Sequence, residues 1–92
     1  MSKNHDLREK LYGKSIVKVG GAFDAMSAKL VESAGFDAIW AGSFAISATH
    51  ALPDASILTM TEFYDVASTM ADACEIPIIA DCDTGYGGPS NV

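Results

Sequence analysis

The sequence predicts an α/β protein, and specifically the amino-terminal portion, about three β-α units, of a (β/α)8 TIM barrel. Short runs of strand-forming residues alternate with helical patterns along the chain. The third such run, residues 76–80, is apolar at almost every position, as in parallel strands covered by helices. A complete barrel needs ~250 residues. We therefore expect residues 1–92 to be an amino-terminal fragment of a single barrel domain.

The first part of the chain contains one predicted helix and one predicted strand. Residues 6–12 have the pattern of a short amphipathic helix that ends at Gly13. Residues 15–19 are rich in β-branched side chains and predict the first strand, which we expect to end at Gly20 and Gly21. A helix is therefore expected before the first β-α unit.

The next segment carries signals for a helix, a strand and a loop. Asp24 is a predicted N-cap for a helix that runs through Ala34 and is closed by Gly35. Residues 36–41 predict the second strand. Residues 42–60 are expected to form a long irregular loop.

A second long helix and the third strand complete the pattern. Thr61 is expected to open the helix. Its apolar residues recur at the spacing of one buried face: Phe63, Val66, Ala67, Met70 and Cys74. Three strands with two crossover helices leave sheet edges open and one face poorly covered, which also favours a piece of a larger barrel.

Charge is distributed unevenly along the chain. The net charge is −6, yet all six basic residues lie in the first 29 positions, and nine of the twelve acidic residues follow them. Such an acidic segment repels nucleic acid and anionic membranes and attracts divalent cations. No apolar run approaches the ~18 residues of a membrane span, and the amino terminus has no apolar leader. We expect a soluble, cytoplasmic protein without nucleic-acid or membrane partners.

The two cysteines, Cys74 and Cys82, are spaced neither as a redox pair nor as a zinc knuckle. We expect both thiols to be reduced and buried, with Cys82 packed behind the edge that faces a metal.

Two carboxylates directly follow the third predicted strand. If the chain stays extended there, Asp81 and Asp83 point the same way and repel one another unless a cation joins them. Carboxylate and water oxygens are the ligands that Mg2+ favours. The alternative is a solvated turn with an Asx-type hydrogen bond into the glycines that follow. The motif by itself leaves the two interpretations equally open.

Other candidates lie at the end of the second strand and in the long loop. The backbone N-H groups of residues 42–44 either bind an anionic ligand or form an ordinary tight turn. Trp40 is either a core residue or a pocket wall. Asp54 follows Pro53, and the two residues are also typical of the start of a turn. A single histidine in a loop, such as His50, is more typical of a surface or packing residue than of a catalyst.

Three segments of the chain resemble the phosphoenolpyruvate mutase/isocitrate lyase superfamily, at compatible spacing. They are residues 32–40, residues 52–59 and residues 78–87. The resemblance extends from about Val17 to the end of the chain. It implies a (β/α)8 barrel, usually oligomeric, that uses Mg2+ to hold α-keto or enol acids.

The resemblance also implies roles for three aspartates. Asp81 matches the Mg2+ ligand, direct or through water, and Asp83 matches its neighbour in the hydration shell of the metal. Asp54 matches the aspartate that lies beside the phosphoryl group, as nucleophile or orienting group, in the mutase and phosphonopyruvate hydrolase branch. The lyases also have an aspartate near this position, so Asp54 alone does not choose a branch.

The turn after the second strand matches a substrate-binding turn of the family with one departure. Gly42, Ser43 and Phe44 match the residues whose backbone amides hold the substrate carboxylate, with Trp40 nearby. Family members commonly have Ser then Gly, whereas this chain has Gly42 then Ser43. The amide contacts are compatible with this order, but a hydroxyl contact from the first position is not.

The resemblance is nearest to the phosphonopyruvate enzymes and implies a phosphoenolpyruvate phosphomutase. This isomerase interconverts phosphoenolpyruvate and phosphonopyruvate with Mg2+ and so makes the carbon-phosphorus bond of phosphonate biosynthesis. The alternatives are a phosphonopyruvate hydrolase, a carbon-carbon lyase of the 2-methylisocitrate or isocitrate type, or an inactive fragment. The small anionic substrate requires cationic donors, and no Lys or Arg follows Lys29, so we expect these donors from strands beyond residue 92. The resemblance also implies that the full-length protein is a homo-oligomer.

Overall fold

The computed structural model describes residues 3–13, 15–53 and 59–82. In this part of the chain one parallel sheet has the strand order β1-β2-β3. Its strands are β1 (Val19–Ala22), β2 (Ala38–Ala41) and β3 (Ile78–Ala80). The α/β class with a parallel sheet is therefore confirmed.

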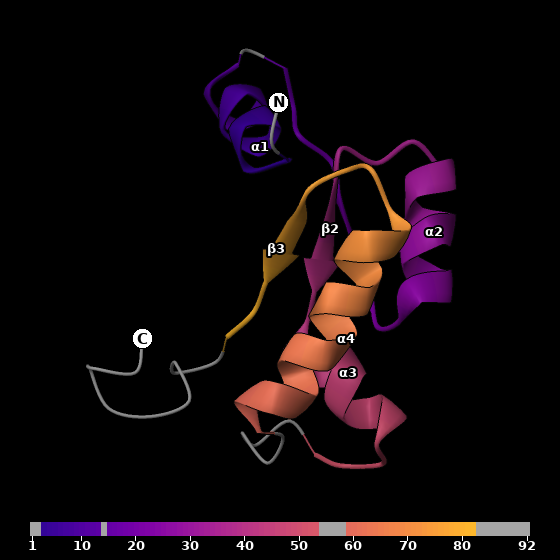
Figure 1. The fold of residues 1–92 in the computed structure, drawn as a ribbon. Coiled ribbons are helices and arrows are strands. Elements are labelled where there is room, and N and C mark those ends of the chain that lie inside the picture. Colours follow the sequence, from indigo (N-terminus) through magenta and orange to yellow (C-terminus); the bar gives the residue numbers. More distant parts are fainter. Residues whose placement is uncertain (1–2, 14, 54–58, 83–92) are drawn as a thin grey trace, which may run out of the picture.

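Two helices cover one face of this sheet (Figure 1). Helix α2 (Ala25–Ser33) packs on β1 and β2, and α4 (Met60–Ala73) packs on β3 and on α2. The strand register places Ile39 on the covered face, where it is fully buried. Trp40 alternates to the opposite face and is 40% exposed. The sheet is thus covered on one side in the described residues.

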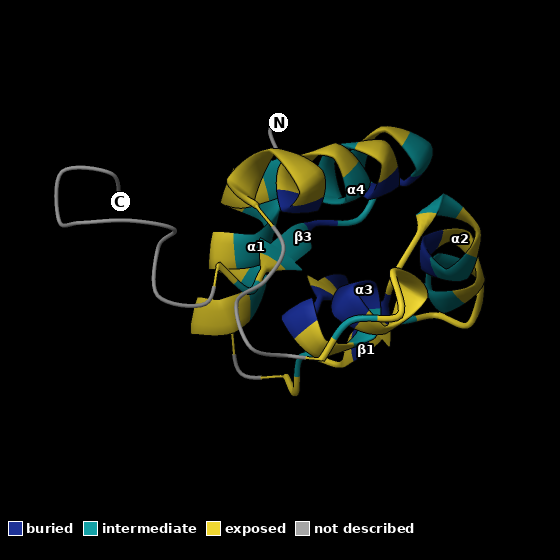
Figure 2. Cartoon of the chain, turned by 90° about the horizontal axis from the view of Figure 1, so that it is seen from below, coloured by how far each residue is buried: buried dark blue, intermediate teal, exposed yellow. Residues whose placement is uncertain are grey.

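The core lies between the sheet and the two covering helices. Figure 2 shows buried positions on the inward sides of α3 and α4, with exposed positions on their outer sides. The core consists of small and medium apolar side chains: Ala22, Ala28, Ile39, Ala41, Ile46, Phe63, Met70 and Cys74. Three members of the predicted face of the long helix, Phe63, Met70 and Cys74, are buried as expected.

A glycine allows α2 to lie close against β1. A Cβ atom placed on Gly20 would lie 2.7 Å from Cγ1 of Val31 and 3.2 Å from the ring of Phe36. Gly20 therefore sits within the strand because the covering helix leaves no room for a side chain. The pair of glycines was expected to end the first strand, and this expectation was wrong: β1 is residues 19–22 rather than 15–19.

Both covering helices begin with reciprocal caps. The Asp24 carboxylate accepts from the N-H of Ser27 at 2.7 Å, and the Ser27 hydroxyl accepts from the N-H of Asp24 at 3.1 Å. At α4, Thr59 and Glu62 make the equivalent pair, so the helix begins at Met60 and not at Thr61 as expected. Gly35, at φ 91°, follows α2 as predicted.

The remaining helices are α1 (Lys3–Tyr12) and α3 (Ser43–Thr49). α1 includes the predicted helix but buries none of its residues. The Lys3 ammonium group donates to the carbonyls of Ala71 and Cys74 at the end of α4, which ties α1 to that helix. α3 lies within the predicted irregular loop, so the expectation for residues 42–60 was wrong over this part.

Among the described residues, none of the helices has both the length and the apolar composition needed to cross a membrane.

Candidate functional site

A cavity of about 230 Å³ lies at the carboxyl ends of the three strands. It is lined by Gly21, Ala22, Trp40, Gly42, Ser43, Phe44, Ala45 and Asp81. The structure therefore brings together five residues that the sequence singled out: Trp40, Gly42, Ser43, Phe44 and Asp81. Their assignment as substrate and metal ligands stays a prediction.

Strand pairing places Asp81 next to the turn after β2. Ala80 pairs with Ala41, and the N-H of Asp81 donates to the Ala41 carbonyl at 3.0 Å, so the backbone of Asp81 extends the ladder. Its half-buried side chain thereby reaches the first residue of α3. The Ser43 hydroxyl donates to Oδ2 of Asp81 at 2.9 Å. The N-H of Ser43 donates more weakly to the same oxygen at 3.4 Å.

These bonds join segments that are 38 residues apart in the sequence. Gly42 is the N-cap of α3 and has no side chain that could accept from the first turn of the helix. The Asp81 carboxylate takes this place, since it accepts from the Ser43 N-H, and negative charge is favourable at a helix start. The expected tight turn of residues 42–44 is therefore the beginning of a helix.

Trp40 forms a wall of the cavity and not part of the core. A Cβ atom placed on Gly42 would lie 2.8 Å from Nε1 of Trp40 and 3.0 Å from Cδ1. The indole thus lies directly against the Gly42 backbone, and this contact is possible because residue 42 is glycine. Phe44 extends further outward and is 72% exposed.

Two predicted site residues fall outside the described residues: Asp54, the expected catalytic aspartate, and Asp83, the expected second metal residue. His50 is exposed, and its Nδ1 atom lies 3.1 Å from the Ile46 carbonyl and 3.2 Å from the Thr49 hydroxyl. His50 therefore packs at the end of α3, as the surface interpretation expects.

The two cysteines differ in their surroundings. Both are free thiols, but Cys74 is buried and Cys82 is exposed. The expectation that Cys82 is buried was therefore wrong: β3 ends at Ala80, and Cys82 lies beyond the helix-covered part of the sheet. Burial raises the pKa of the Cys74 thiol, which favours its protonated and unreactive form.

Among the described residues that line the cavity, one, Asp81, carries a carboxylate. Within residues 3–13, 15–53 and 59–82 there is no cluster of three or more His, Cys, Asp or Glu side chains that could hold a metal ion. Mg2+ is typically held by one or two carboxylates with water and substrate oxygens, whereas zinc sites need more protein ligands. The half-buried Asp81 carboxylate in the cavity is therefore compatible with Mg2+.

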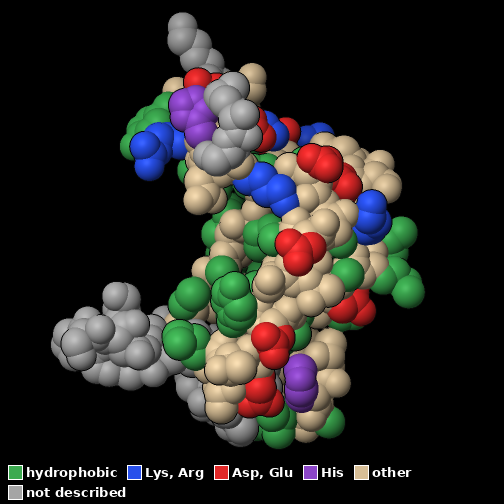
Figure 3. Space-filling view, viewed as in Figure 1, with side chains coloured by type: hydrophobic (Ala, Val, Ile, Leu, Met, Phe, Trp, Pro, Cys, Tyr) green, Lys and Arg blue, Asp and Glu red, His purple; other side chains and the backbone are tan. Residues whose placement is uncertain are grey.

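Charge in space follows charge in the sequence. In Figure 3 the Lys and Arg side chains lie in the upper half of the molecule, and acidic side chains continue toward the lower end, where α3 lies in Figure 1. The strands run downward in this view, so their carboxyl ends point away from the Lys and Arg side chains seen in Figure 3.

Sequence reasoning missed part of the cavity. Gly21, Ala22 and Ala45 line it without any chemical signal of their own. The bond between Ser43 and Asp81 was also missed, because it depends on the register of β2 and β3.

Comparison with known proteins places this arrangement among related enzymes. The family described as "Phosphoenolpyruvate phosphomutase" matches residues 7–92. A solved phosphoenolpyruvate phosphomutase from Streptomyces platensis subsp. rosaceus is similar with 48% identity and a TM-score of 0.92, over 95% of this chain and 30% of that chain. A phosphonopyruvate hydrolase solved with oxalate and Mg2+ is 41% identical with a TM-score of 0.95, over 99% and 32%.

A lyase is similar to the same degree. The 2,3-dimethylmalate lyase of Eubacterium barkeri is 44% identical over 87 residues, which are 94% of this chain and 30% of the lyase. The chain thus spans about a third of the length of the proteins it matches. In the solved relatives it corresponds to the amino-terminal portion of the barrel.

Proposed function

The chain belongs to the phosphoenolpyruvate phosphomutase family of the PEP mutase/isocitrate lyase superfamily, and from this premise we propose that the protein is a phosphoenolpyruvate phosphomutase. It would interconvert phosphoenolpyruvate and phosphonopyruvate with Mg2+. We further propose that residues 1–92 form the amino-terminal part of a single barrel domain, since the matched relatives are about three times as long.

The observation that carries the proposal is the meeting of Asp81 with the turn at residues 42–44. The carboxylate and the turn come from different strands, line one cavity and are joined by a 2.9 Å hydrogen bond. Active sites of barrel enzymes lie at this end of the strands. The cavity thus combines a carboxylate for a cation with backbone donors for an anion, which is the combination that a metal-bound organic acid requires.

Each residue has a proposed role toward the substrate. Asp81, with Asp83, would hold Mg2+, which when bound polarises the pyruvyl oxygens of the substrate. The backbone N-H groups of the 42–44 turn would bind the substrate carboxylate, and Trp40 would exclude water from one side of it. Asp54 would face the phosphoryl group as it moves between oxygen and carbon.

Charge balance limits what these residues do alone. The substrate carries several negative charges, and residues 30–92 contain no Lys or Arg. The cationic groups that stabilise a moving phosphoryl group are therefore proposed to come from other parts of the barrel. With this division of charge, Asp81 and residues 42–44 would bind the metal and the carboxylate group of the substrate, but not its phosphoryl group.

The second candidate is phosphonopyruvate hydrolysis, in which the same phosphoryl group passes to water. It is favoured by the similarity to the solved hydrolase over 99% of this chain, at a TM-score of 0.95. Carbon-carbon bond cleavage is the third, because the dimethylmalate lyase is as similar in sequence as the hydrolase. All three reactions act on the anion of a small organic acid.

Phosphorus NMR of the full-length protein with phosphonopyruvate and Mg2+ separates these candidates. We expect the phosphonate signal to be replaced by that of phosphoenolpyruvate. Appearance of inorganic phosphate as the first product would instead assign the hydrolase. An unchanged phosphonate signal, together with cleavage of a 2-methylisocitrate-type substrate, would overturn both phosphonate assignments in favour of a lyase.

A further inference from the structure

We propose that Ser43 is a positioning residue, whose hydroxyl fixes the orientation of the Asp81 carboxylate for the metal. The inference rests on the proposed function, because it takes Asp81 to be a ligand of Mg2+. It assigns to the Ser43 side chain a task different from binding of the substrate carboxylate by the backbone of the 42–44 turn.

Two donors from one residue meet the same carboxylate oxygen. The Ser43 hydroxyl lies 2.9 Å from Oδ2 of Asp81, and the Ser43 N-H lies 3.4 Å from it. Ser43 is only 4% exposed, so little water competes for this contact. A hydrogen bond to an ionised carboxylate in such surroundings is stronger than one between neutral groups.

The contact supplies an orientation that the aspartate side chain does not set for itself. The terminal torsion of aspartate has a broad energy profile, so an isolated carboxylate rotates over a wide range. The backbone of Asp81 is held by its N-H bond to Ala41 at 3.0 Å, and Ser43 is held as the first residue of α3. With both backbones held, the hydrogen bond from the hydroxyl to Oδ2 restricts the rotation of the carboxylate.

The packing of Trp40 explains why the hydroxyl comes from residue 43 and not from residue 42. A Cβ atom on residue 42 would meet the indole at 2.8 Å, so a side chain there requires Trp40 to move. The neighbouring position faces Asp81 and is buried without such a conflict. The order Gly42 then Ser43 thus preserves the Trp40 wall and still provides a hydroxyl.

Metal affinity measured without substrate tests the proposal in the full-length protein. Titration of Mg2+ by calorimetry, and of Mn2+ by electron paramagnetic resonance, reports binding independently of turnover. Partners that orient a metal ligand typically contribute 10 to 100-fold in affinity. We expect Ser43→Ala to weaken binding by about 10-fold or more, and Ser43→Thr, which keeps a hydroxyl, to restore most of it.

Ser47 provides the matched control. It is also 4% exposed and lies one turn further along α3, so Ser47→Ala removes an equally buried hydroxyl from the same helix. We expect this variant to bind Mg2+ like the parent protein. If Ser43→Ala does not fold, Ser43→Cys replaces it, since a thiol has a similar size but is a weaker donor, and it should also weaken metal binding.

The outcomes separate this proposal from the proposed function. Asp81→Asn should abolish metal binding. Metal binding unaffected by Asp81→Asn would overturn the proposed metal role itself. If Asp81→Asn does not bind Mg2+ but Ser43→Ala binds it with the same affinity as Ser47→Ala, the positioning role of Ser43 is overturned and the metal role of Asp81 is not. A raised substrate KM with unchanged metal affinity in Ser43→Ala would assign the hydroxyl to the substrate instead.

Discussion

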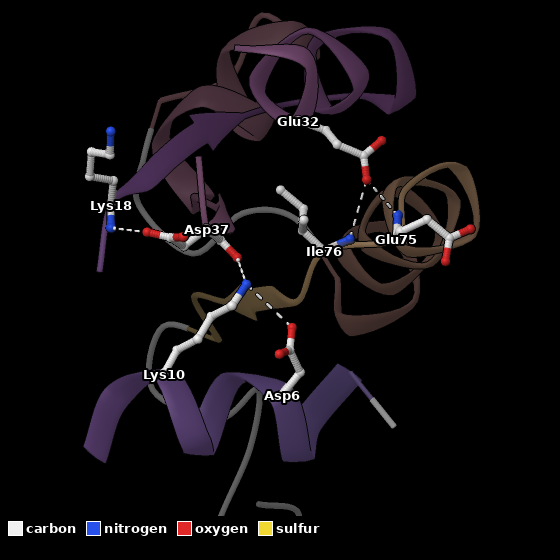
Figure 4. A network of polar contacts seen from close by, with 7 residues as sticks. All are labelled: Asp6, Lys10, Lys18, Glu32, Asp37, Glu75 and Ile76. Carbon is white, nitrogen blue, oxygen red and sulfur yellow. Dashed lines mark hydrogen bonds and ion pairs between the residues drawn. The ribbon is translucent and has the colours of Figure 1, made fainter. Parts of the chain in front are cut away.

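The amino and carboxyl ends of the sheet use their acidic side chains differently. At the amino end, shown in Figure 4, the Glu32 carboxylate accepts from the N-H groups of Glu75 at 2.7 Å and Ile76 at 3.3 Å. The Asp37 carboxylate accepts from the N-H of Lys18 at 2.9 Å. At the carboxyl end, the Asp81 carboxylate lies beside a cavity and accepts from a hydroxyl and a weakly bonded N-H.

The difference lies in the donors that each carboxylate binds. Those at the amino end bind backbone N-H groups that precede the strands, whereas Asp81 binds mainly a side-chain hydroxyl at the start of α3. Lys10 adds to this network by donating to the Asp37 carbonyl at 3.3 Å and pairing with Asp6 at 3.3 Å (Figure 4). In barrels, the amino end of the strands serves stability and the carboxyl end serves chemistry. Variants at the two ends should therefore separate stability from activity.

The largest expected effect is the loss of activity in Asp81→Ala. If Asp81 holds Mg2+ as proposed, its removal takes away several kcal/mol of transition-state stabilisation, and turnover should fall on the order of 10³-fold. The midpoint of thermal unfolding without Mg2+ should fall by a smaller margin, since the substitution removes the acceptor of the buried Ser43 hydroxyl but no core packing. Phosphorus NMR and calorimetry measure the two quantities. Retained Mg2+-dependent activity would refute the assignment of the carboxyl end.

The two adjacent glycines of β1, Gly20 and Gly21, should differ in how far a substitution lowers the free energy of unfolding. Gly20→Ala places a Cβ atom 2.7 Å from Val31 and should cost about 1 to 3 kcal/mol through overpacking. Gly21→Ala meets no atom within 4 Å and lines the cavity, so it should leave the free energy of unfolding nearly unchanged and raise the substrate KM. Urea denaturation and steady-state kinetics test this. Equal destabilisation by both variants would contradict the packing of α2 on β1.

Glu32→Ala tests the amino end directly. Two backbone N-H groups lose their acceptor, and because this segment is partly exposed, water replaces part of the loss. We expect a destabilisation of about 1 kcal/mol with unchanged kcat, measured by denaturation and kinetics. Asp72→Ala, which removes an exposed carboxylate on α4, is the matched control and should have a smaller effect. A kcat reduced in Glu32→Ala alone would show that the ends are not independent.

The smallest effect concerns the helix caps at acid pH. The backbone hydrogen bond from Ser27 lowers the pKa of Asp24 below its ordinary value of 3.8. That from Thr59 lowers the pKa of Glu62 below 4.5. A carboxyl group whose pKa is lowered in the folded state stabilises the fold at pH values above its ordinary pKa. This contribution is lost as the pH falls through the lowered pKa of the folded state. The thermal midpoint should therefore decrease as the pH is lowered from about 4.5. The decrease should be less steep in Asp24→Asn than in the parent protein, because asparagine keeps the cap but does not titrate. If the thermal midpoints of the parent protein and of Asp24→Asn decrease equally at acid pH, the Asp24 cap does not contribute to the pH dependence.

Sequence patterns predicted the parts of the fold that local signals determine. The N-cap Asp24, the glycine after α2 and the buried face of α4 each depend on residues close together in the sequence. The boundaries of β1 were not predictable in this way. Gly20 lies inside the strand because Val31 and Phe36 leave no room for a side chain there, and that contact is tertiary.

Helix α3 was missed for a related reason. Its sequence has two serines and a threonine in seven residues and only moderate helix propensity. Burial of Ser43, Ile46 and Ser47 holds it in place. The rule that ligands bind beyond strand ends identified Trp40, the 42–44 turn and Asp81, but not the bond between Ser43 and Asp81, which requires the strand register.

The contact of Lys3 with the end of α4 has a consequence for the order of events during synthesis. Its carbonyl partners lie 68 and 71 positions further along the chain, so the first helix emerges from the ribosome long before the residues it docks on. Before α4 has been made, α1 lacks this contact but can make that of Lys10 with the Asp37 carbonyl. Amide exchange in the first turn of α1 should therefore be faster in a nascent chain arrested before residue 71 than in a longer one.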